Sequence, residues 1–393
     1  MGNPQERLRS LHIAGTNGKG SVCATLDSLL RAKGLRVGKY TSPHLVDFRE
    51  RFLVNGRPVD GQFVVDFIQR WTPTVERIGA TFFEATTAMA FDLFAREEVD
   101  AAVIETGLGG RLDSTNVLRP LACGVTSIGI DHTEYLGDTR EQIAAEKAGI
   151  FKRGVPAVIG EPDPAIRTLL ADFAIEREAR RILDVAVDAV PDEVSVGVDG
   201  TTFTVTIGGE RGRVRTGLAG AHQASNASLA LLMLNAAGGP FSTTLNEARE
   251  ALPAIRLPGR FQRVGPYIFD VAHNPDGAAV LAVTVDAVRP PTPRAAVLCV
   301  LGDKDWRGVM TALSRVVDTF ILTYAPTAPT SRAWDREAAL AFAGEHGWAA
   351  MSEPDFDRAL LRATEVSSTV IVTGSFHTVG DDMARLNVDP VDG

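Results

Sequence analysis

A glycine-rich turn near the N-terminus carries the clearest chemical signal in the chain. It lies between an apolar run at residues 11–14 and a helical pattern at residues 22–30, and it reads Gly15, Thr16, Asn17, Gly18, Lys19, Gly20 and Ser21. The N–H groups of such a turn, the start of the following helix and the lysine all favour bound phosphates. The turn departs from the usual phosphate loop, because Ile13 replaces the first glycine and Gly20 follows the lysine. An ordinary strand–helix turn is the alternative, but the residue types predict a polyphosphate site.

Three side chains that suit a metal ion stand at or just beyond the ends of predicted strands. Ser42, Glu105 and His132 follow or close strands expected at residues 37–41, 101–105 and 122–127. Ligands bind outside the carboxyl ends of parallel strands, and Mg²⁺ accompanies polyphosphates. We therefore expect a Mg²⁺ site beside the turn. Taken singly, Glu105 also fits a solvated charge, and His132 also fits a packing or capping residue.

Lys147 lies on a predicted helix at residues 140–150, among small neighbours. A lysine in such surroundings is able to reach inward without crowding. On composition alone, however, the pattern indicates a surface lysine on a solvated helix face.

Strands and helices alternate along most of the chain, which predicts an α/β fold with a parallel sheet covered on both faces. Residues 185–214 differ, because they are rich in Val and Thr and contain glycine turns, and they predict a small antiparallel insert. At Leu257-Pro258-Gly259-Arg260 the helical pattern stops, and a second strand–helix series begins at Tyr267. We expect two domains, residues 1–256 and residues 257–393.

The composition excludes several classes of protein. The 393 residues carry a formal net charge of −9 without a basic stripe, so nucleic acid is not an expected partner. The cysteines, Cys23, Cys123 and Cys299, are too widely spaced to predict a disulfide framework or a zinc site. The sequence has neither an apolar signal core nor a run of about 18 apolar residues. We expect a cytoplasmic protein without a membrane partner.

An ordered set of motifs, from about Asn3 to about Gly380, resembles one family. Besides the turn at residues 15–21, the motifs are Thr41-Ser42-Pro43-His44, Phe82-Phe83-Glu84, Glu105-Thr106-Gly107-Leu108-Gly109-Gly110, Asp131-His132-Thr133, Glu146-Lys147-Ala148-Gly149, Pro258-Gly259-Arg260, Asp270-Val271-Ala272-His273-Asn274 and Asp303-Lys304-Asp305. Together they resemble folylpolyglutamate synthase/dihydrofolate synthase, a branch of the Mur ligase superfamily. That family uses the same variant of the phosphate loop.

The resemblance implies a role for each matched residue. ATP would contact the turn from Gly15 to Ser21 together with Asn226, Arg260 and Asp270. Mg²⁺ ions would be held by Ser42, Glu105, His132 and a Lys147 that CO₂ has converted to a carbamate, which reverses the surface interpretation of that lysine. Catalysis would depend on Lys147, Lys19, Arg260 and His273. The acceptor substrate would be surrounded by Thr81, Phe82, Phe83, Glu84, Leu112, Asp113 and Ser114.

The resemblance also implies the fold and the reaction. It points to a parallel-sheet P-loop ATPase-type domain with a small β insert, then a smaller Rossmann-like α/β domain, in a monomer. ATP would phosphorylate the carboxylate of a folate or of dihydropteroate, and the amine of L-glutamate would attack the acyl phosphate to form an amide. The alternatives are a Mur-type ligase that glutamylates a different cofactor or a cell-wall precursor, and a nucleotide-binding regulatory module that has lost catalysis.

The sequence departs from the family pattern in two places. Family members usually begin a few tens of residues earlier, with a segment that contributes to the dihydropteroate pocket. We therefore expect tetrahydrofolate to be the main acceptor and dihydropteroate the second candidate. The other departure is Ser375-Phe376-His377, where the family usually has Ser-Leu-Tyr.

Overall fold

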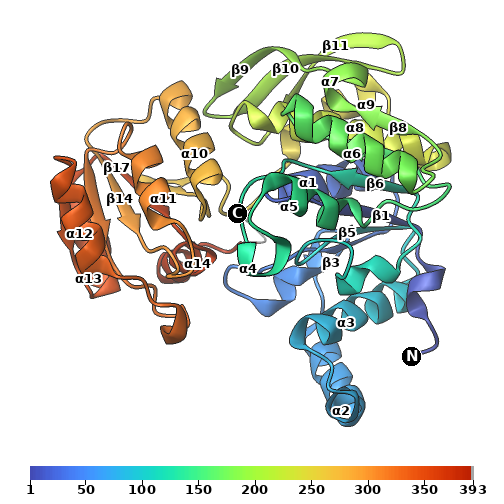
Figure 1. Cartoon of the computed structure of the whole chain (residues 1–393), viewed down its shortest axis with the longest axis horizontal. Coiled ribbons are helices and arrows are strands. Elements are labelled where there is room, and N and C mark those ends of the chain that lie inside the picture. Colours follow the sequence, from blue (N-terminus) through green and yellow to red (C-terminus); the bar gives the residue numbers. More distant parts are fainter. Residues whose placement is uncertain (391–393) are drawn as a thin grey trace.

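The computed structural model describes residues 1–390, which form two α/β bodies and a small β insert (Figure 1). The larger body contains an eight-stranded sheet with the order β4-β3-β2-β5-β1-β6-β7-β8. Neighbours from β2 to β8 are parallel, whereas β3 and β4 add an antiparallel edge. The strands are β1 (Ser10–Ala14), β2 (Val37–Tyr40), β3 (Phe52–Val54), β4 (Arg57–Pro58), β5 (Ala101–Glu105), β6 (Ala122–Val125), β7 (Ala157–Ile159) and β8 (Ile182–Asp184).

Helices cover both faces of this sheet, because successive residues of a strand point to opposite sides. On β5, Ala101 and Val103 belong to the core beneath α1 and α8, whereas Ala102 and Ile104 belong to the core beneath α3. The strands β6 and β7 pack in the same way against α5 and α6. The helices of this body are α1 (Lys19–Ala32), α2 (Gly61–Ile78), α3 (Phe82–Arg96), α4 (Thr133–Leu136), α5 (Arg140–Ala148), α6 (Pro164–Glu176), α7 (Val185–Asp188), α8 (His222–Ala237) and α9 (Leu245–Ala251).

The β insert is a three-stranded antiparallel sheet that lies at the top of Figure 1. Its strands are β9 (Asp192–Gly197), β10 (Gly200–Ile207) and β11 (Glu210–Thr216). The prediction of strand from residue 185 onward is wrong at its start, because residues 185–188 form the helical turn α7. The Asp184 carboxylate accepts a hydrogen bond from the Ala186 N–H and so caps this turn.

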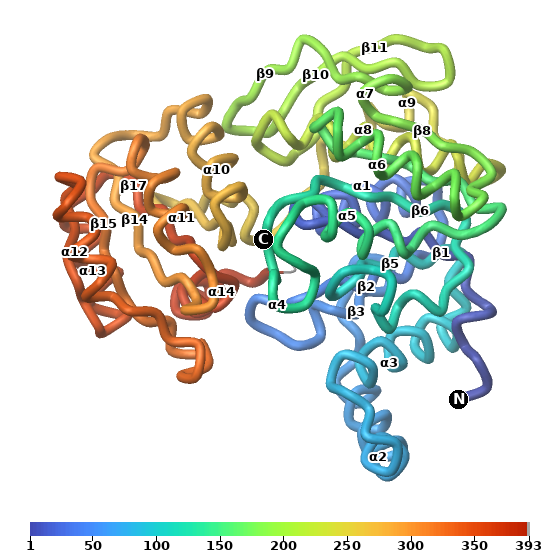
Figure 2. Tube along the Cα trace, in the orientation of Figure 1, coloured from blue at the N-terminus to red at the C-terminus, as the bar shows by residue number. Residues whose placement is uncertain are grey.

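The second body is a six-stranded sheet with the order β12-β13-β17-β14-β15-β16, parallel except for β12. Its strands are β12 (Gln262–Val264), β13 (Tyr267–Phe269), β14 (Arg294–Leu298), β15 (Thr319–Leu322), β16 (Ala350–Ser352) and β17 (Thr369–Thr373), and its helices are α10 (Pro275–Val288), α11 (Trp306–Leu313), α12 (Arg336–Glu345), α13 (Phe356–Val366) and α14 (Phe376–Arg385). Figure 2 shows that α10 lies on the side facing the β insert.

The expected α/β architecture is confirmed, with a large parallel sheet, a β insert and a second α/β sheet. Several element boundaries differ from the prediction. The helix expected at residues 22–30 begins at Lys19, inside the glycine-rich turn, and the strand expected at residues 122–127 ends at Val125. Within residues 1–390, no helix combines the length and apolar character needed to cross a lipid bilayer.

Asp382 on α14 is a buried carboxyl group without a partner among the described residues. Its side chain is fully enclosed, and neither carboxylate oxygen accepts a hydrogen bond. Burial raises the pKa of Asp382 to about 7, although Arg385 opposes the shift. The folded protein therefore retains a proton that the unfolded chain, with an aspartate pKa of about 4, releases.

Stability should consequently fall as the pH rises from about 4 to about 7, and stay low above that range. Asp382→Asn removes the cost of charging the buried group. We expect this variant to be more stable than the parent by about 2 kcal/mol at pH 8 and equally stable near pH 4. Urea unfolding at the two pH values measures the difference, and an equal gain at both would contradict the assignment to Asp382.

Candidate active site

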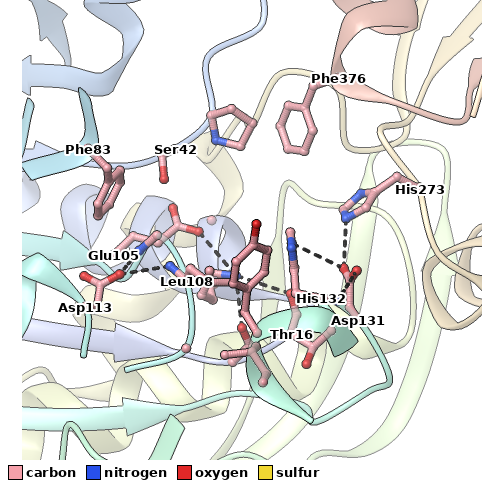
Figure 3. A pocket seen from close by; sticks show the side chains of 18 of the residues that line it. Thr16, Ser42, Phe83, Glu105, Leu108, Asp113, Asp131, His132, His273 and Phe376 are labelled. Atoms are coloured by element: carbon pink, nitrogen blue, oxygen red, sulfur yellow. Dashed lines mark hydrogen bonds and ion pairs between the residues drawn. The ribbon is translucent and has the colours of Figure 1, made fainter. Parts of the chain in front are cut away.

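A cavity of about 830 Å³ opens between the large sheet and the second body, and both bodies contribute to its wall (Figure 3). Most of the residues selected from the sequence line it. From the larger body these are Gly15, Thr16, Asn17, Gly18, Lys19, Gly20, Ser42, Thr81, Phe82, Phe83, Glu84, Glu105, Leu112, Asp113, Ser114, His132 and Lys147, and from the second body Arg260 and His273. Ser21, Asn226 and Asp270 do not line the cavity.

The glycine-rich turn joins β1 to α1 at one end of the cavity. Gly15 has φ +149°, and a Cβ atom there would lie 1.7 Å from the Thr126 Oγ1 atom, so only glycine fits this close approach. Lys19 Nζ folds back over the turn and donates hydrogen bonds to the Gly15 and Thr16 carbonyls at 3.0 and 3.3 Å. The turn therefore presents a lysine and the N-terminus of a 14-residue helix to the cavity.

Glu105 brings a buried carboxylate to the same end of the cavity. Its Oε1 atom lies 3.8 Å from Lys19 Nζ. Burial raises the pKa of Glu105, while the Lys19 charge and a hydrogen bond from the Ser42 backbone N–H act in the opposite direction. Ser42, Glu105 and Lys19 thus meet beside the turn, as the order of strand ends predicts.

Lys147 is buried, so the surface lysine that composition alone indicates is wrong. The helix α5 carries it into the cavity wall, where its Nζ atom donates to the Gly15 carbonyl at 2.9 Å. Burial lowers the pKa of Lys147 to about 7, and the nearby charge of Lys19 contributes to the shift. A large share of the amine is therefore uncharged and nucleophilic at neutral pH.

Asp131 connects the larger body to the second body across the cavity. Its carboxylate pairs with Lys304 Nζ and lies 3.4 Å from His273 Nε2, and it accepts a hydrogen bond from Asn274 Nδ2 at 3.3 Å. Burial works against ionisation, but the hydrogen bond from His273 and the charges of His132 and Lys304 hold the pKa of Asp131 well below its usual range. Figure 3 shows His132 and His273 on either side of this carboxylate.

His132 follows Asp131 directly and adopts a left-handed backbone conformation, with φ +53°. This conformation is uncommon for residues other than glycine. Burial lowers the pKa of the His132 imidazole to about 4, which leaves the ring neutral near pH 7. A neutral imidazole is the form that binds a metal ion.

A second contact between the bodies involves two asparagines. Asn17 Nδ2 donates to Asn274 Oδ1 at 3.3 Å, and Asn274 Nδ2 donates to Asn17 Oδ1 at 3.2 Å. Asn274 also caps α10 by accepting from the Gly277 N–H. The glycine-rich turn is therefore tied to the start of α10 in the second body.

The residues that lie outside the cavity wall support its edges. Both carboxylate oxygens of Asp270 accept backbone N–H groups, from Phe261 at 2.9 Å and Ala272 at 3.0 Å, and so they fix the chain that carries Arg260. Asn226 packs against the glycine-rich turn, because a Cβ atom on Gly18 would lie 2.7 Å from its Oδ1 atom.

The far end of the cavity is more apolar and is formed by the start of α3 and by residues 107–114. Thr81 and Glu84 form a capping box that fixes the start of α3, and Phe83 lies beside Tyr40. Phe82 and Leu112 expose 64% and 79% of their surface, so a bound molecule could cover them. Several other lining residues were not predicted as site residues, namely Arg51, Tyr135, Arg332, Phe376 and His377. Lys304 also lines the cavity. In the sequence it was indicated by the Asp303-Lys304-Asp305 motif.

The donor set suits a hard cation that brings ligands of its own. Within residues 1–390, no group of three or more His, Cys, Asp and Glu side chains is placed to hold a metal ion unaided. Ser42, Glu105 and His132 nevertheless line one cavity beside the glycine-rich turn. Mg²⁺ retains water and takes ligands from substrate phosphates, so a sparse protein donor set beside a phosphate turn fits it.

Comparison with known families matches two models to the chain. The Mur ligase middle domain matches residues 13–234, and the Mur ligase glutamate ligase domain matches residues 259–376. A dihydrofolate synthase/folylpolyglutamate synthase of Mycobacterium tuberculosis is 37% identical over 88% of this chain and 75% of its own length. The Escherichia coli protein of the same name is 36% identical over 94% of this chain and 85% of its own length.

Solved structures are similar over almost the whole chain. M. tuberculosis folylpolyglutamate synthase complexed with ADP has a TM-score of 0.90 and 33% identity, covering 99% of this chain and 92% of its own. E. coli FolC in complex with DHPP and ADP has a TM-score of 0.86 and 34% identity, covering 98% and 91%. A bifunctional folylpolyglutamate synthase/dihydrofolate synthase with Mn, AMPPNP and L-glutamate bound has a TM-score of 0.83 and 34% identity, covering 98% and 91%.

Proposed function

The chain belongs to the folylpolyglutamate synthase/dihydrofolate synthase family of Mur ligases, and from this premise we propose that it joins L-glutamate to a folate carboxylate at the expense of ATP. Tetrahydrofolate is the proposed main acceptor and dihydropteroate the second. The observation that carries the proposal is the single cavity in which Lys19, Glu105 and Lys147 meet Arg260 from the second body. Relatives that bind ADP, DHPP and L-glutamate support the choice of substrates.

ATP and a divalent metal ion fit the end of the cavity that holds the glycine-rich turn. The turn from Gly15 to Ser21 would receive the phosphates together with Arg260 from the second body, while Asn226 packs against the turn and Asp270 fixes the chain that carries Arg260. Ser42, Glu105 and His132 would hold Mg²⁺, which neutralises phosphate charge when it is bound. The related structure with Mn and AMPPNP bound supports a divalent metal ion together with ATP.

Lys147 is proposed to become a carbamate. CO₂ reacts with a neutral amine, and the lowered pKa of about 7 supplies that form. The amine nitrogen forms a bond to the CO₂ carbon and releases one proton, and the resulting anionic carbamate would offer oxygen ligands for Mg²⁺. Lys147 Nζ lies 2.9 Å from the Gly15 carbonyl, so the new group would stand beside the phosphate turn.

The protein's own contribution to the reaction is positioning and charge. Lys19 from the larger body and Arg260 from the second body would neutralise the charge of the transferred phosphoryl group. His273 lies beside Asp131 at the seam between the bodies, where it is able to orient the incoming glutamate. Phe83 and Glu84 on α3, together with Leu112, Asp113 and Ser114, would surround the acceptor. Closure of the two bodies around bound substrates would keep water from the acyl phosphate, which hydrolyses readily.

Three further proposals concern the chain as a whole. The domain boundary is placed at residues 256 and 257, between the strands of the large sheet and those of the second body. The protein is proposed to act as a monomer, because one chain supplies both walls of the cavity. A cytoplasmic location is proposed, where folates and ATP are available.

The test is glutamate-dependent release of ADP from ATP and Mg²⁺, measured in parallel with tetrahydrofolate and with dihydropteroate. We expect release with tetrahydrofolate, together with a product heavier by one glutamyl residue in mass spectrometry. Release with dihydropteroate as well would define a bifunctional enzyme. ADP binding without turnover on either acceptor would contradict the proposal and favour a ligase for another substrate or a nucleotide-binding module.

A further inference from the structure

A chain of polar groups runs through the interior of the large sheet to the acceptor end of the cavity. It begins at His12 in the middle of β1, a strand whose five residues are all buried. His12 Nε2 lies 2.8 Å from Thr115 Oγ1, and Thr115 Oγ1 in turn donates to Asp113 Oδ1. Asp113 Oδ2 accepts the backbone N–H groups of Gly107 and Leu108, each at 2.9 Å (Figure 3).

The direction of every hydrogen bond in this chain is fixed by valence. An ionised carboxylate only accepts, so the single hydroxyl proton of Thr115 is committed to Asp113. Thr115 Oγ1 must then accept from His12, which requires the proton of a neutral imidazole to sit on Nε2. Burial lowers the pKa of His12 to about 3, which agrees with a neutral ring.

The Asp113 carboxylate is fully used by these contacts. Oδ1 accepts the N–H and the hydroxyl of Thr115, and Oδ2 accepts the N–H groups of Gly107 and Leu108. Four bonds match the four acceptor positions of a carboxylate. Gly107 also packs directly beneath the Phe83 ring, since a Cβ atom there would lie 2.2 Å from the ring. Asp113 therefore sets the position of the cavity wall at residues 107–108.

One ring nitrogen of His12 has no partner. Its Nδ1 atom is buried and has no hydrogen-bond partner among the described residues, which is unfavourable for a polar group. Its neighbours on the same face of β1, Ser10 and Ala14, are also buried. An aliphatic residue at position 12 would remove the unpartnered nitrogen but also the hydrogen bond to Thr115, so the contact with Thr115 is what the imidazole contributes.

We propose that His12 and Thr115 are positioning residues for the acceptor pocket, which they shape by holding Asp113 against the backbone of residues 107–108. Neither side chain lines the cavity, and both act through Asp113. This inference rests on the proposed function, because it assumes that the acceptor lies against residues 107–114.

The first pair of variants is Thr115→Val and Thr115→Ser. Valine has nearly the shape of threonine but breaks the chain, whereas serine keeps the hydroxyl. We expect Thr115→Val to raise the KM for tetrahydrofolate about tenfold and to change the KM for ATP less than about twofold. Thr115→Ser should keep both values near those of the parent. A tetrahydrofolate KM for Thr115→Val equal to that of Thr115→Ser, or a parallel rise in the ATP KM, would overturn the proposal.

His12→Gln and His12→Leu form the second pair, because a glutamine amide is able to donate from near the position of Nε2. Glutamine should preserve the KM for tetrahydrofolate and leucine should raise it, and equal values would overturn the proposal. If the parent protein turns over neither acceptor, the proposed function fails. The hydrogen-bond chain is then still tested by the protonation of the two ring nitrogens of His12, which does not depend on turnover. Nitrogen NMR should report the Nε2–H tautomer in the parent, with the resonance shifted in Thr115→Val, whereas an Nδ1–H tautomer would contradict the chain.

Discussion

Replacing Lys147 by alanine is expected to lower glutamate-dependent turnover by about 100-fold or more. The amine is buried, is largely neutral because of its lowered pKa, and lies beside the phosphate turn. Carbamylation would convert Lys147 from a cation to an anion that is able to bind Mg²⁺ beside the phosphate turn. Lys147→Arg should be almost as inactive, because a guanidinium stays charged and does not form a stable carbamate. ADP release at saturating ATP and acceptor measures both losses.

The control is Lys33→Ala, which removes a lysine at the end of α1. Lys33 Nζ pairs with Glu247 and does not line the cavity, so turnover should stay near that of the parent. Protein equilibrated with ¹³C-bicarbonate should show a carbamate carbon signal that is absent from Lys147→Ala. Parental turnover in Lys147→Arg, or the same signal in both proteins, would disprove the carbamate.

The sequence predicted the parts of the fold that follow from local patterns. Alternating apolar strands and helices indicated the parallel sheet, and glycine turns indicated the β insert. The helix α2 was not predicted, because much of its surface stays exposed, as at Ile68 and Ile78, and Phe67 is its one buried residue. The start of α7 was assigned to strand because its valines favour β structure, whereas the cap from Asp184 decides the conformation.

In the site, too, residues in local motifs were predicted from the sequence, whereas contacts between residues distant in sequence were not. Motif residues at successive strand ends, such as Ser42 and Glu105, do meet beside the glycine-rich turn, because parallel strands place their carboxyl ends together. The hydrogen-bond chain from His12 to Asp113 was not predicted, since it joins residues about a hundred positions apart. The pairing of Asp131 with Lys304 was missed for the same reason, and it depends on how the second body docks.

That pairing leads to the second large effect, which is expected for Asp131→Ala. The carboxylate is the shared partner of Lys304, His273 and Asn274, all on the second body, and both Asp131 and Lys304 are almost fully buried. Removing one member of a buried pair costs about 3–5 kcal/mol, because the other charge is left without a partner. In this protein the unpaired Lys304 charge regains contact with water if the two bodies separate. The free-energy cost should therefore appear as opening of the cavity and not as unfolding of either body.

We therefore expect Asp131→Ala to lower kcat/KM for glutamate at least about 100-fold and to increase the radius of gyration in X-ray scattering. Lys304→Met should do the same from the second body. In the double variant the losses should be less than additive, since each single change already breaks the pair. Asp192→Ala removes an exposed ion pair with Arg211 and serves as the control, with little expected effect. If the double variant instead loses the full sum, Asp131 and Lys304 act separately and do not hold the two bodies together.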